Sequence, residues 1–270
     1  MRLLPGTLAQ HPVERKRFAY VILEYMSILS RFRIIGEEEK DKAVKTLVER
    51  STPDFDFFFM MTLAVLMAAL GLLSGSETIV IGSMLIAPLL YPVLGVSLGL
   101  SLSDLVLMRH SLATLLKAAV IGVAAAALAA LFYSSAHAAV ITPEILLRTA
   151  PTLPLLAIAV ISALAMSYAL ARPKLSETLP GIAISVALIP PLAVIGIGLA
   201  WLNLSILIGA LGVFLLNIIG IVATGLVSFS LMDVHRARQT AETTLKKEEQ
   251  RVEQEAKKVE RVDAASKPGA

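Results

Sequence analysis

Long apolar stretches separated by short polar connections occupy the chain from Phe55 to Leu231. Each stretch has about the 20 residues that an α-helix needs to cross the hydrocarbon core of a bilayer. Six such segments can be marked out: Phe55–Leu73, Thr78–Leu102, His110–Tyr133, Arg148–Leu170, Thr178–Trp201 and Leu204–Leu231. The pattern therefore predicts an all-α polytopic membrane protein with six transmembrane segments.

The second apolar segment is interrupted by its own sequence. Pro88 and Pro92 lie near its centre, with Ser83 and Tyr91 close by. Proline lacks a backbone donor and clashes with the preceding turn, so this helix should kink or break inside the bilayer. Backbone groups freed at that depth must face protein or water, and transporters build their sites there. The alternative interpretation is a kinked helix that serves only packing.

The two halves of the apolar region match each other at a spacing of one hundred residues. The aligned segments are Ser76–Thr78 with Ser176–Thr178, Leu115–Lys117 with Leu215–Asn217, Ser103 with Asn203 and, after a slip of two residues, Ser83–Pro88 with Ser185–Pro190. An odd number of spans in each half forces the second half to enter the membrane from the opposite side. The sequence therefore predicts two inverted-topology three-helix repeats, residues 55–134 and 148–231, with a Pro-broken second helix in each.

The polar segment before the first span, residues 1–54, is predicted to form cytoplasmic amphipathic helices. A helix is expected from Pro12, and its apolar stripe from Phe18 to Phe32 is surrounded by Arg and Lys, which suits packing on anionic lipid or on a neighbouring subunit. A second short helix is expected over Glu37–Arg50, with acids in its first turn and a solvated charged face.

The segment after the last span, residues 232–270, is predicted to form a charged helical tail in the cytoplasm. Leu245, Val252 and Val259 recur every seven residues, but Glu248 and Glu255 take the alternate positions that a coiled coil would fill with apolar side chains. The tail is therefore either a solvated helix or a weak bundle in a homo-oligomer.

Composition and charge support the membrane assignment and give an orientation. The chain is 56% hydrophobic with a mean hydropathy of +0.77, which is too apolar for a soluble domain. Lys and Arg of the short connections gather in the second and fourth connections and after the sixth segment, so the positive-inside rule places both termini in the cytoplasm of an inner-membrane protein. The net charge of +3 suits anionic headgroups, and no basic patch with interleaved aromatic residues points to nucleic acid.

The residues expected along a substrate or ion pathway follow from the two interrupted segments. They are Ser83, Pro88, Tyr91, Pro92, Ser185, Pro190, Pro191 and Asn217. A half-helix that starts after Pro88 or after Pro190 and Pro191 would point free amides at the protein interior and favour an anion, while the carbonyls of the preceding half-helix favour a cation.

Three charged residues near the membrane are candidates for gating or coupling. Glu77 and Glu177 follow Ser76 and Ser176 at the starts of the interrupted segments, where a helix cap with an acid in the first turn is the structural alternative. Lys117 lies about two turns inside the third segment, and it either extends its ammonium group to the boundary or places a charge inside the bundle.

Sequence motifs of enzymes are missing. There is no H-E-x-x-H, G-x-S-x-G, phosphate-binding loop or dinucleotide-binding glycine pattern, there is no cysteine, and the four histidines lack metal-ligand spacing. We therefore expect a protein that is not an enzyme and that carries neither a cofactor nor a metal.

The second segment also resembles a known family. The run Val80–Leu89, VIGSMLIAPL, preceded by Leu70–Leu73 and followed by Pro92, is similar to the signature of the prokaryotic hydrophobic integral membrane proteins grouped as family 389 of the domains of unknown function. The resemblance covers roughly Pro53–Leu231 and implies the same membrane fold. It implies no biochemical activity, because the family has none assigned.

Taken together, the sequence favours a membrane transporter or channel for a small ion or polar solute, with its site between two Pro-interrupted helices. The expected partners are the lipid bilayer, the solute and further copies of the same chain. The rival class is a non-transporting membrane scaffold or sensor that binds partners or anionic lipid through its cytoplasmic helices. A lipid-modifying enzyme is a third class.

Overall fold

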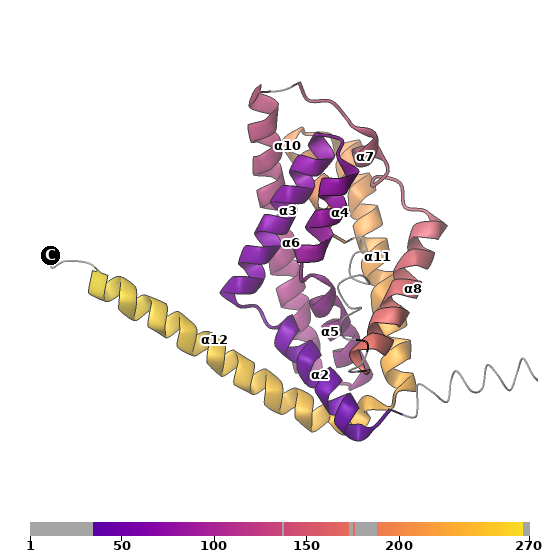
Figure 1. Cartoon of the computed structure of the whole chain (residues 1–270), viewed down its shortest axis with the longest axis vertical. Coiled ribbons are helices and arrows are strands. Elements are labelled where there is room, and N and C mark those ends of the chain that lie inside the picture. Colours follow the sequence, from indigo (N-terminus) through magenta and orange to yellow (C-terminus); the bar gives the residue numbers. More distant parts are fainter. Residues whose placement is uncertain (1–34, 137, 173–174, 176–187, 267–270) are drawn as a thin grey trace, which may run out of the picture.

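The computed structural model describes residues 35–136, 138–172, 175 and 188–266, and this part of the chain is helical apart from its connections (Figure 1). Its bundle contains α3 (Phe55–Leu73), α4 (Glu77–Ile86), α5 (Leu90–Ser101), α6 (Leu105–Ala136), α8 (Leu153–Leu170), α10 (Ile189–Ala200) and α11 (Leu204–Leu231). The remaining helices are α2 (Glu37–Ser51), α7 (Pro143–Leu146), η2 (Val234–Ala237) and α12 (Arg238–Ser266). The expected basic helix before residue 35 lies outside the described residues.

Among the described residues, four helices are long and apolar enough to cross a membrane, namely α3, α6, α8 and α11, and a fifth span results if α4 and α5 count as one bent span. The chain is therefore a multi-pass membrane protein. The predicted bounds of the first and sixth segments are confirmed, since α3 covers Phe55–Leu73 and α11 covers Leu204–Leu231.

The start of the fourth segment was predicted wrongly at Arg148, because α8 begins at Leu153. Pro151 and Pro154 explain the difference, since proline is tolerated in the first turn of a helix but not in its interior. Of the fifth segment, the structure describes only the part from Leu188 onward, where α10 begins at Ile189.

The predicted break at Pro88 is confirmed. Helix α4 ends at Ile86, α5 begins at Leu90, and the two axes differ in direction by 50°. Ala87, the residue before the proline, has an extended backbone with ψ of 125°, as the proline ring requires. Pro92 lies in the first turn of α5, where a missing N–H costs no helical hydrogen bond. Pro190 takes the same kind of position at the start of α10.

Two tight turns of the bundle are built in the same way. After α5, Ser103 has a positive φ of 54° and Asp104 N–H bonds to the Gly99 carbonyl at 2.8 Å. After α10, Leu202 has a φ of 52° and Asn203 N–H bonds to the Gly198 carbonyl at 2.9 Å. These bonds satisfy carbonyls that the ending helix leaves free.

The last residue of each turn also caps the next helix. Asp104 Oδ1 accepts hydrogen bonds from Val106 N–H and Leu107 N–H at the start of α6. Asn203 Oδ1 accepts from Ile206 N–H at the start of α11. Asp104 and Asn203, ninety-nine positions apart, thus take the same place in the two turns, whereas the sequence comparison pairs Ser103 with Asn203.

These two turns lie at opposite ends of the bundle. Trp201, in the α10–α11 turn, donates from Nε1 to Ser134 Oγ at 3.0 Å, near the last turn of α6. The α5–α6 turn lies at the other end of α6, where α2 and α12 also lie (Figure 1). We call these the α7 end and the α12 end, because α7 lies beside the former, where Thr142 Oγ1 donates to the Leu72 carbonyl.

Small residues let the central helices cross closely. A Cβ atom on Gly196 of α10 would lie 2.5 Å from Ala126 Cβ of α6, and a Cβ on Gly225 of α11 would lie 2.7 Å from Ser97 Oγ of α5. At these distances no larger side chain fits without moving a helix.

The α12 end is covered by α2, η2 and the first turns of α12. Helix α2 confirms the prediction over Glu37–Arg50 and includes the expected Glu38–Lys42 pair at 3.0 Å. Its face is not wholly solvated, however. Lys40 is only 6% exposed, and its Nζ binds Glu37 Oε1 at 2.9 Å and the Asp233 carbonyl beyond α11 at 3.4 Å.

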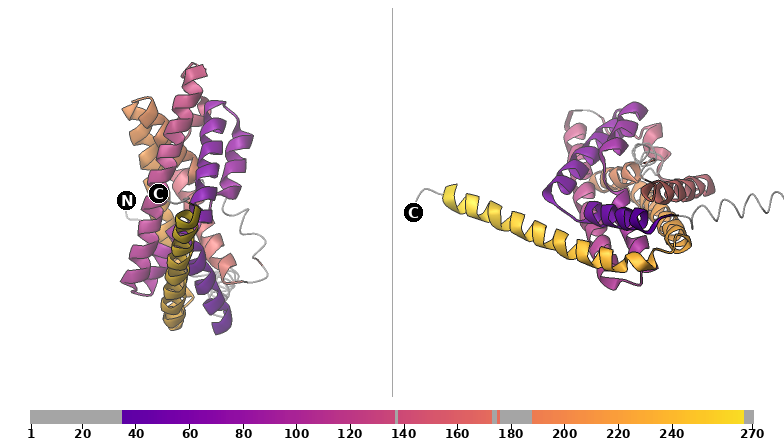
Figure 2. Two further views of the ribbon diagram at one scale, coloured as in Figure 1. Left: turned by 90° about the vertical axis from the view of Figure 1, so that its left-hand side faces the viewer. Right: turned by 60° about the horizontal axis from the view of Figure 1, so that its bottom comes forward.

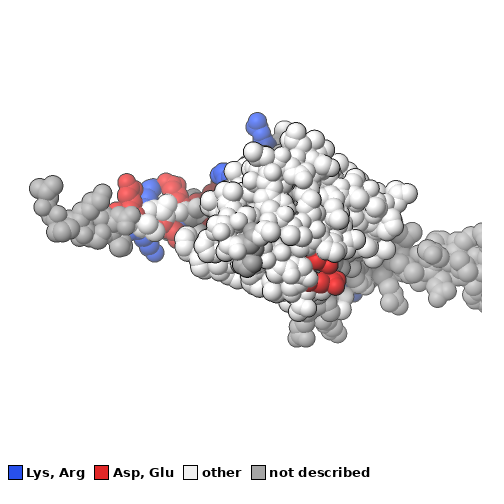
Figure 3. Space-filling view, turned by 90° about the horizontal axis from the view of Figure 1, so that it is seen from above, with Lys and Arg blue, Asp and Glu red and all other residues white. Residues whose placement is uncertain are grey.

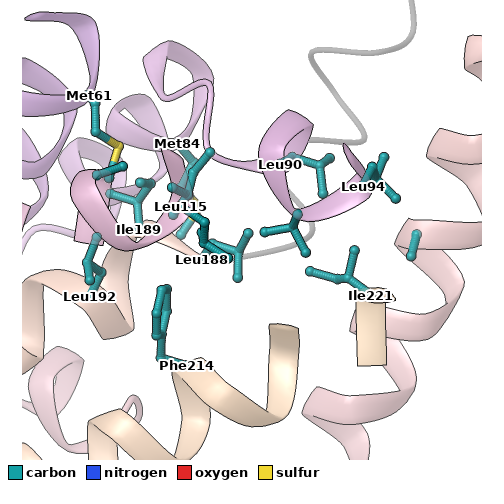
Figure 4. Close-up of a cluster of buried hydrophobic side chains, with 14 of the residues drawn as sticks. Met61, Met84, Leu90, Leu94, Leu115, Leu188, Ile189, Leu192, Phe214 and Ile221 are labelled. Atoms are coloured by element: carbon teal, nitrogen blue, oxygen red, sulfur yellow. The ribbon is translucent and has the colours of Figure 1, made fainter. Parts of the chain in front are cut away.

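Apolar side chains fill the middle of the bundle. The cluster in Figure 4 brings together side chains of α3, α4, α5, α6, α10 and α11, including Met61, Met84, Leu90, Leu115, Ile189, Leu192 and Phe214. In the view onto the α7 end, almost all of the visible bundle surface is free of charged side chains, which gather on the projecting α12 (Figure 3). A surface of this kind suits lipid contact.

Candidate functional site: two cavities at the proline-started helices

A cavity of about 510 Å³, here called cavity A, lies at the α12 end. Its wall includes Pro88 and Tyr91 from the break between α4 and α5, and Phe57 from α3. The other lining residues are Glu49, Arg50, Thr52, Asp54, Asp56, Met60, Ile86, Glu248 and Arg251. Cavity A therefore leads from the polar end of the bundle to the place where the second span is interrupted.

The start of α5 is held to α2 by contacts at Tyr91. Arg50 Nη1 donates a hydrogen bond to Tyr91 Oη at 2.6 Å, and its guanidinium carbon lies 5.0 Å from the centre of the same ring. Ser51 Oγ lies 2.9 Å from the Tyr91 carbonyl oxygen and donates to it. Movement of α2 would therefore be transmitted to the break in the membrane span.

Charged side chains surround the outer part of cavity A. Asp54 caps α3 through Oδ1, which accepts from Phe57 N–H at 2.8 Å. Its Oδ2 lies 3.2 Å from Arg251 Nη2 of α12, and Arg251 also lies 2.9 Å from Glu248 Oε2. Four acids and two arginines among the described lining residues make this wall polar and net negative.

A second cavity, cavity B, has a volume of about 730 Å³ and lies toward the α7 end. It reaches Pro191 in the first turn of α10 and Val213 and Asn217 on α11. The other lining residues belong to α7, to the connection after it and to the start of α8: Pro143, Leu146, Leu147, Arg148, Ala150, Thr152, Pro154 and Leu155. Cavity B thus approaches the second proline-started helix from the opposite end of the molecule.

The described lining of cavity B is largely apolar and includes one charged side chain, Arg148, which is paired with Glu144 outside the lining. Arg148 Nη1 binds Glu144 Oε2 at 2.7 Å, and the two side chains are only 19% and 15% exposed. Asn217 is 2% exposed and supplies an amide at the inner wall. The Glu144 carboxylate therefore compensates the charge that Arg148 brings to this wall.

Buried apolar side chains lie at the starts of the two proline-started helices. Leu90 begins α5, Leu188 precedes Ile189 at the start of α10, and all three belong to the same buried cluster as Met84 and Leu192 (Figure 4). The described side chains of this cluster at the two helix starts are therefore apolar. Cavity A and cavity B share no described lining residue.

The structure places the predicted pathway residues in different surroundings. Pro88 and Tyr91 line cavity A, and Pro191 and Asn217 line cavity B. Pro92 and Pro190 are buried in the first turns of their helices. Ser83 is fully buried and donates to the Val80 carbonyl of its own helix at 2.6 Å. Ser185 lies outside the described residues.

The two charged candidates that the structure describes, Glu77 and Lys117, lie apart from each other. Glu77 is exposed in the first turn of α4, where Ser76 precedes the helix without a side-chain capping bond. Lys117 is exposed on the outer surface of α6, whereas Asn217 is buried in α11. At the spacing of ninety-nine residues seen in the turns, Asn217 corresponds to Ala118, so the predicted pairing of Lys117 with Asn217 does not match the structure. Glu177 lies outside the described residues.

The sequence reasoning missed most of the charged lining of both cavities. The sequence pattern places Arg50, Asp54 and Arg251 in polar segments that flank the membrane and Arg148 at the edge of a span, so it predicts none of them in a cavity wall. One available signal was the pair of arginines, Arg50 and Arg148, each of which comes shortly before a membrane span. Among the described residues no group of His, Asp and Glu could hold a metal ion.

Comparison with known proteins gives a family and no activity. The family model "Domain of unknown function (DUF389)" matches residues 84–223. An uncharacterized protein of Methanocaldococcus jannaschii is 30% identical over 173 residues, which is 63% of this chain and 52% of the relative, so the chain spans about half of that relative's length. No solved structure matches the chain. Since the family model covers about half of the chain, including α5, α6 and α10, the protein belongs to the DUF389 family.

Proposed function

We propose that the protein is a transporter or channel that moves a small ion or polar solute across the cell (inner) membrane. The observation that carries this proposal is the pair of cavities, which enter from opposite ends and stop at the proline-started helices α5 and α10. The apolar cluster between them is the barrier that must open for a solute to pass. Hydrophobic constrictions of this kind close a pathway by excluding water.

The architecture that we propose is six spans in two inverted three-helix repeats. The close contact of Ser97 with Gly225 supports it, together with the contact of Gly196 with Ala126. Adding ninety-nine to the residue number takes Ser97 to Gly196 and Ala126 to Gly225. The two contacts therefore join equivalent positions, with the roles of the two halves exchanged. Exchanged contacts are expected of two halves related by a two-fold axis, and inverted repeats bind their solute between the halves.

The proposed orientation puts the α12 end in the cytoplasm, with both termini on that side. The positive-inside distribution of Lys and Arg supports this, because α2, α12 and the α5–α6 turn before Arg109 all lie at the α12 end. We further propose that the functional unit is a homo-oligomer and that the activity is transport without covalent chemistry.

A flux experiment tests this function. Purified protein in liposomes would be offered a panel of radiolabelled ions and small polar metabolites, and we expect uptake of at least one of them. Pro88→Ala, which lets α4 continue across the break, should reduce that uptake about tenfold or more. Ile208→Ala, on the exposed face of α11, is the control and should retain it. Lack of flux for every solute, or a Pro88→Ala variant as active as the wild type, would contradict the proposal.

The second candidate function is a membrane scaffold or sensor. The observation that favours it is α12, whose outer half projects from the bundle (Figure 2) and carries charges of both signs (Figure 3). Substitution of exposed residues such as Glu260 and Arg261 should abolish the physiological effect of a scaffold, while a transporter should keep its flux.

A further inference from the structure

Helix α12 forms part of the wall of cavity A. Its first turns are anchored at the α12 end, where Ala241 and Leu245 are buried and Thr240 Oγ1 donates to Asp41 Oδ1 of α2 at 2.9 Å. Further along the helix, Glu248 and Arg251 line the cavity together with Pro88 of the span break. The helix therefore reaches from a firm anchor to the edge of the cavity that leads to the break.

Weak contacts hold this part of α12 against the membrane bundle. Arg251 Nη2 lies 3.2 Å from Asp54 Oδ2 at the start of α3, and the Arg251 side chain is 47% exposed. Glu249 Oε1 lies 3.6 Å from His110 Nδ1 of α6. Exposed pairs like Arg251–Asp54 shift an equilibrium only about two- to fivefold, so this contact can open and close at little cost.

Beyond Arg251 the described side chains of α12 have left the bundle. Residues 253–261 are exposed, and Lys257 forms its ion pair with Glu253 of the same helix at 2.6 Å. Figure 2 shows this outer half extending away from the other helices. A segment with few buried contacts moves more easily than the core that it leaves.

We propose that α12 is a gate over cavity A, closed by the ion pair between Arg251 and Asp54. In the closed state, Glu248 and Arg251 narrow the way to the break at Pro88. When the pair separates, α12 moves outward from its anchor at Leu245 and water-soluble molecules reach the cavity more easily. This gate concerns access to the cavity, so it can be tested whether or not a solute crosses the membrane.

The chain offers a clean test because it contains no cysteine. A single Ile86→Cys substitution places a thiol in the wall of cavity A, beside the break. The variant would be placed in lipid nanodiscs, and its rate of reaction with a short, uncharged poly(ethylene glycol) maleimide would be measured. Adding Arg251→Glu replaces attraction to Asp54 with repulsion, and we expect labelling to become about fivefold faster or more.

Two controls separate gating from general loosening. Lys257→Glu changes the same charge on the projecting part of α12 and should leave the rate at Ile86→Cys unchanged. Val213→Cys reports on cavity B, and its labelling should not respond to Arg251→Glu. Arg251→Lys keeps the positive charge, so the labelling rate of Ile86→Cys should stay close to the rate measured with Arg251 in place.

The gate is contradicted if the labelling rate of Ile86→Cys is the same with Arg251→Glu as without it. Equal acceleration at Val213→Cys, or by Lys257→Glu, also overturns it, because access would then not depend on the Arg251–Asp54 contact. Flux measured on the same variants in liposomes distinguishes the two proposals, since a failed gate leaves transport intact and absent transport leaves the labelling result valid.

Discussion

The α5–α6 turn at the α12 end and the α10–α11 turn at the α7 end are built alike, but different segments cover them. Both turns have a residue with positive φ, Ser103 or Leu202, followed by a capping residue, Asp104 or Asn203. At the α12 end, long polar helices cover the bundle, and at the α7 end one short helix and an apolar connection do so. The hairpin is thus a shared unit, while the covers are specific to each end.

The arginines near the two proline-started helices show what this difference means. Arg50 is exposed and stacks on Tyr91, whereas Arg148 is mostly buried and paired with Glu144. An exposed contact exchanges easily with water, while a buried ion pair resists separation because each charge would be left without compensation. We infer that the α12 end is the one that changes more readily.

The largest expected effect is at the buried pair of cavity B. Arg148→Met leaves the Glu144 carboxylate mostly buried without its partner, which should lower the free energy of unfolding by about 3 kcal/mol. Arg50→Met, in the corresponding place, should cost less than about 1 kcal/mol. Unfolding in sodium dodecyl sulfate, followed by circular dichroism, would measure both.

A double variant is the control for this prediction. Glu144→Leu combined with Arg148→Met removes both charges, so it should recover much of the lost stability. Equal losses for Arg50→Met and Arg148→Met would remove the proposed difference between the ends.

The next largest effect concerns how closely the two helix backbones approach each other in each hairpin. A Cβ on Gly99 would lie 2.6 Å from the Met108 backbone nitrogen, and one on Gly198 would lie 2.8 Å from that of Leu207. Gly99→Ala and Gly198→Ala should therefore each lower the free energy of unfolding by about 2 kcal/mol, because a backbone must move. The thermal midpoint of the purified protein would report this loss.

Gly212→Ala is the matched control for the hairpin glycines. It lies within α11, where the nearest atom to an added Cβ is Pro151 Cγ at 3.7 Å. This variant should be as stable as the wild type or slightly more so, since alanine favours a helix over glycine. A loss equal to that of Gly198→Ala would show that helix propensity, and not close approach, determines the effect.

A smaller effect distinguishes the two caps. Asp104 accepts two backbone hydrogen bonds and Asn203 accepts one from a described residue. Replacement by alanine should cost about 1 kcal/mol at either position, and more at Asp104. Hydrogen exchange of the first-turn amides in α6 and α11 would locate the loss, and faster exchange elsewhere would contradict a local cap.

The smallest expected effect is a gain in stability when glycine replaces the residue with positive φ in each turn. Leu202 has a φ of 52° and is 85% exposed, so Leu202→Gly should relieve about 1 kcal/mol of backbone strain. Ser103→Gly should gain no more than that, because serine is smaller. Ile208→Gly, on a helical exposed position, should instead lose stability, and the three thermal midpoints would be compared.

Much of the fold could be predicted because lipid imposes strong rules on sequence. The bounds of α3 and α11 follow from apolar length alone, and the break after Ile86 follows from Pro88. The start of α8 does not follow from the apolar run, because Pro151 and Pro154 fix where its first turn can begin. The two turns correspond at a spacing of ninety-nine and not one hundred residues, and the sequence does not distinguish the two, because apolar residues align with each other almost equally well at neighbouring spacings.

The candidate site was less predictable. Pro88, Tyr91, Pro191 and Asn217 line cavities, but Ser83 bonds to its own helix and Lys117 faces outward. Sequence identifies where a helix must be interrupted, because that depends on local backbone chemistry. It does not identify which way a polar side chain points when the residues on all sides are apolar.

By itself, the sequence determined that this chain is a multi-pass helical membrane protein with an interrupted span at Pro88, because apolar length and proline chemistry act within a few neighbouring residues. Only the tertiary structure decided that α6 and α11 pack against both proline-started helices, that cavities approach these helices from opposite ends, and that Arg251 of the tail lies beside Asp54. Those contacts join residues far apart in the chain, and packing between helices, which no local pattern encodes, selects them.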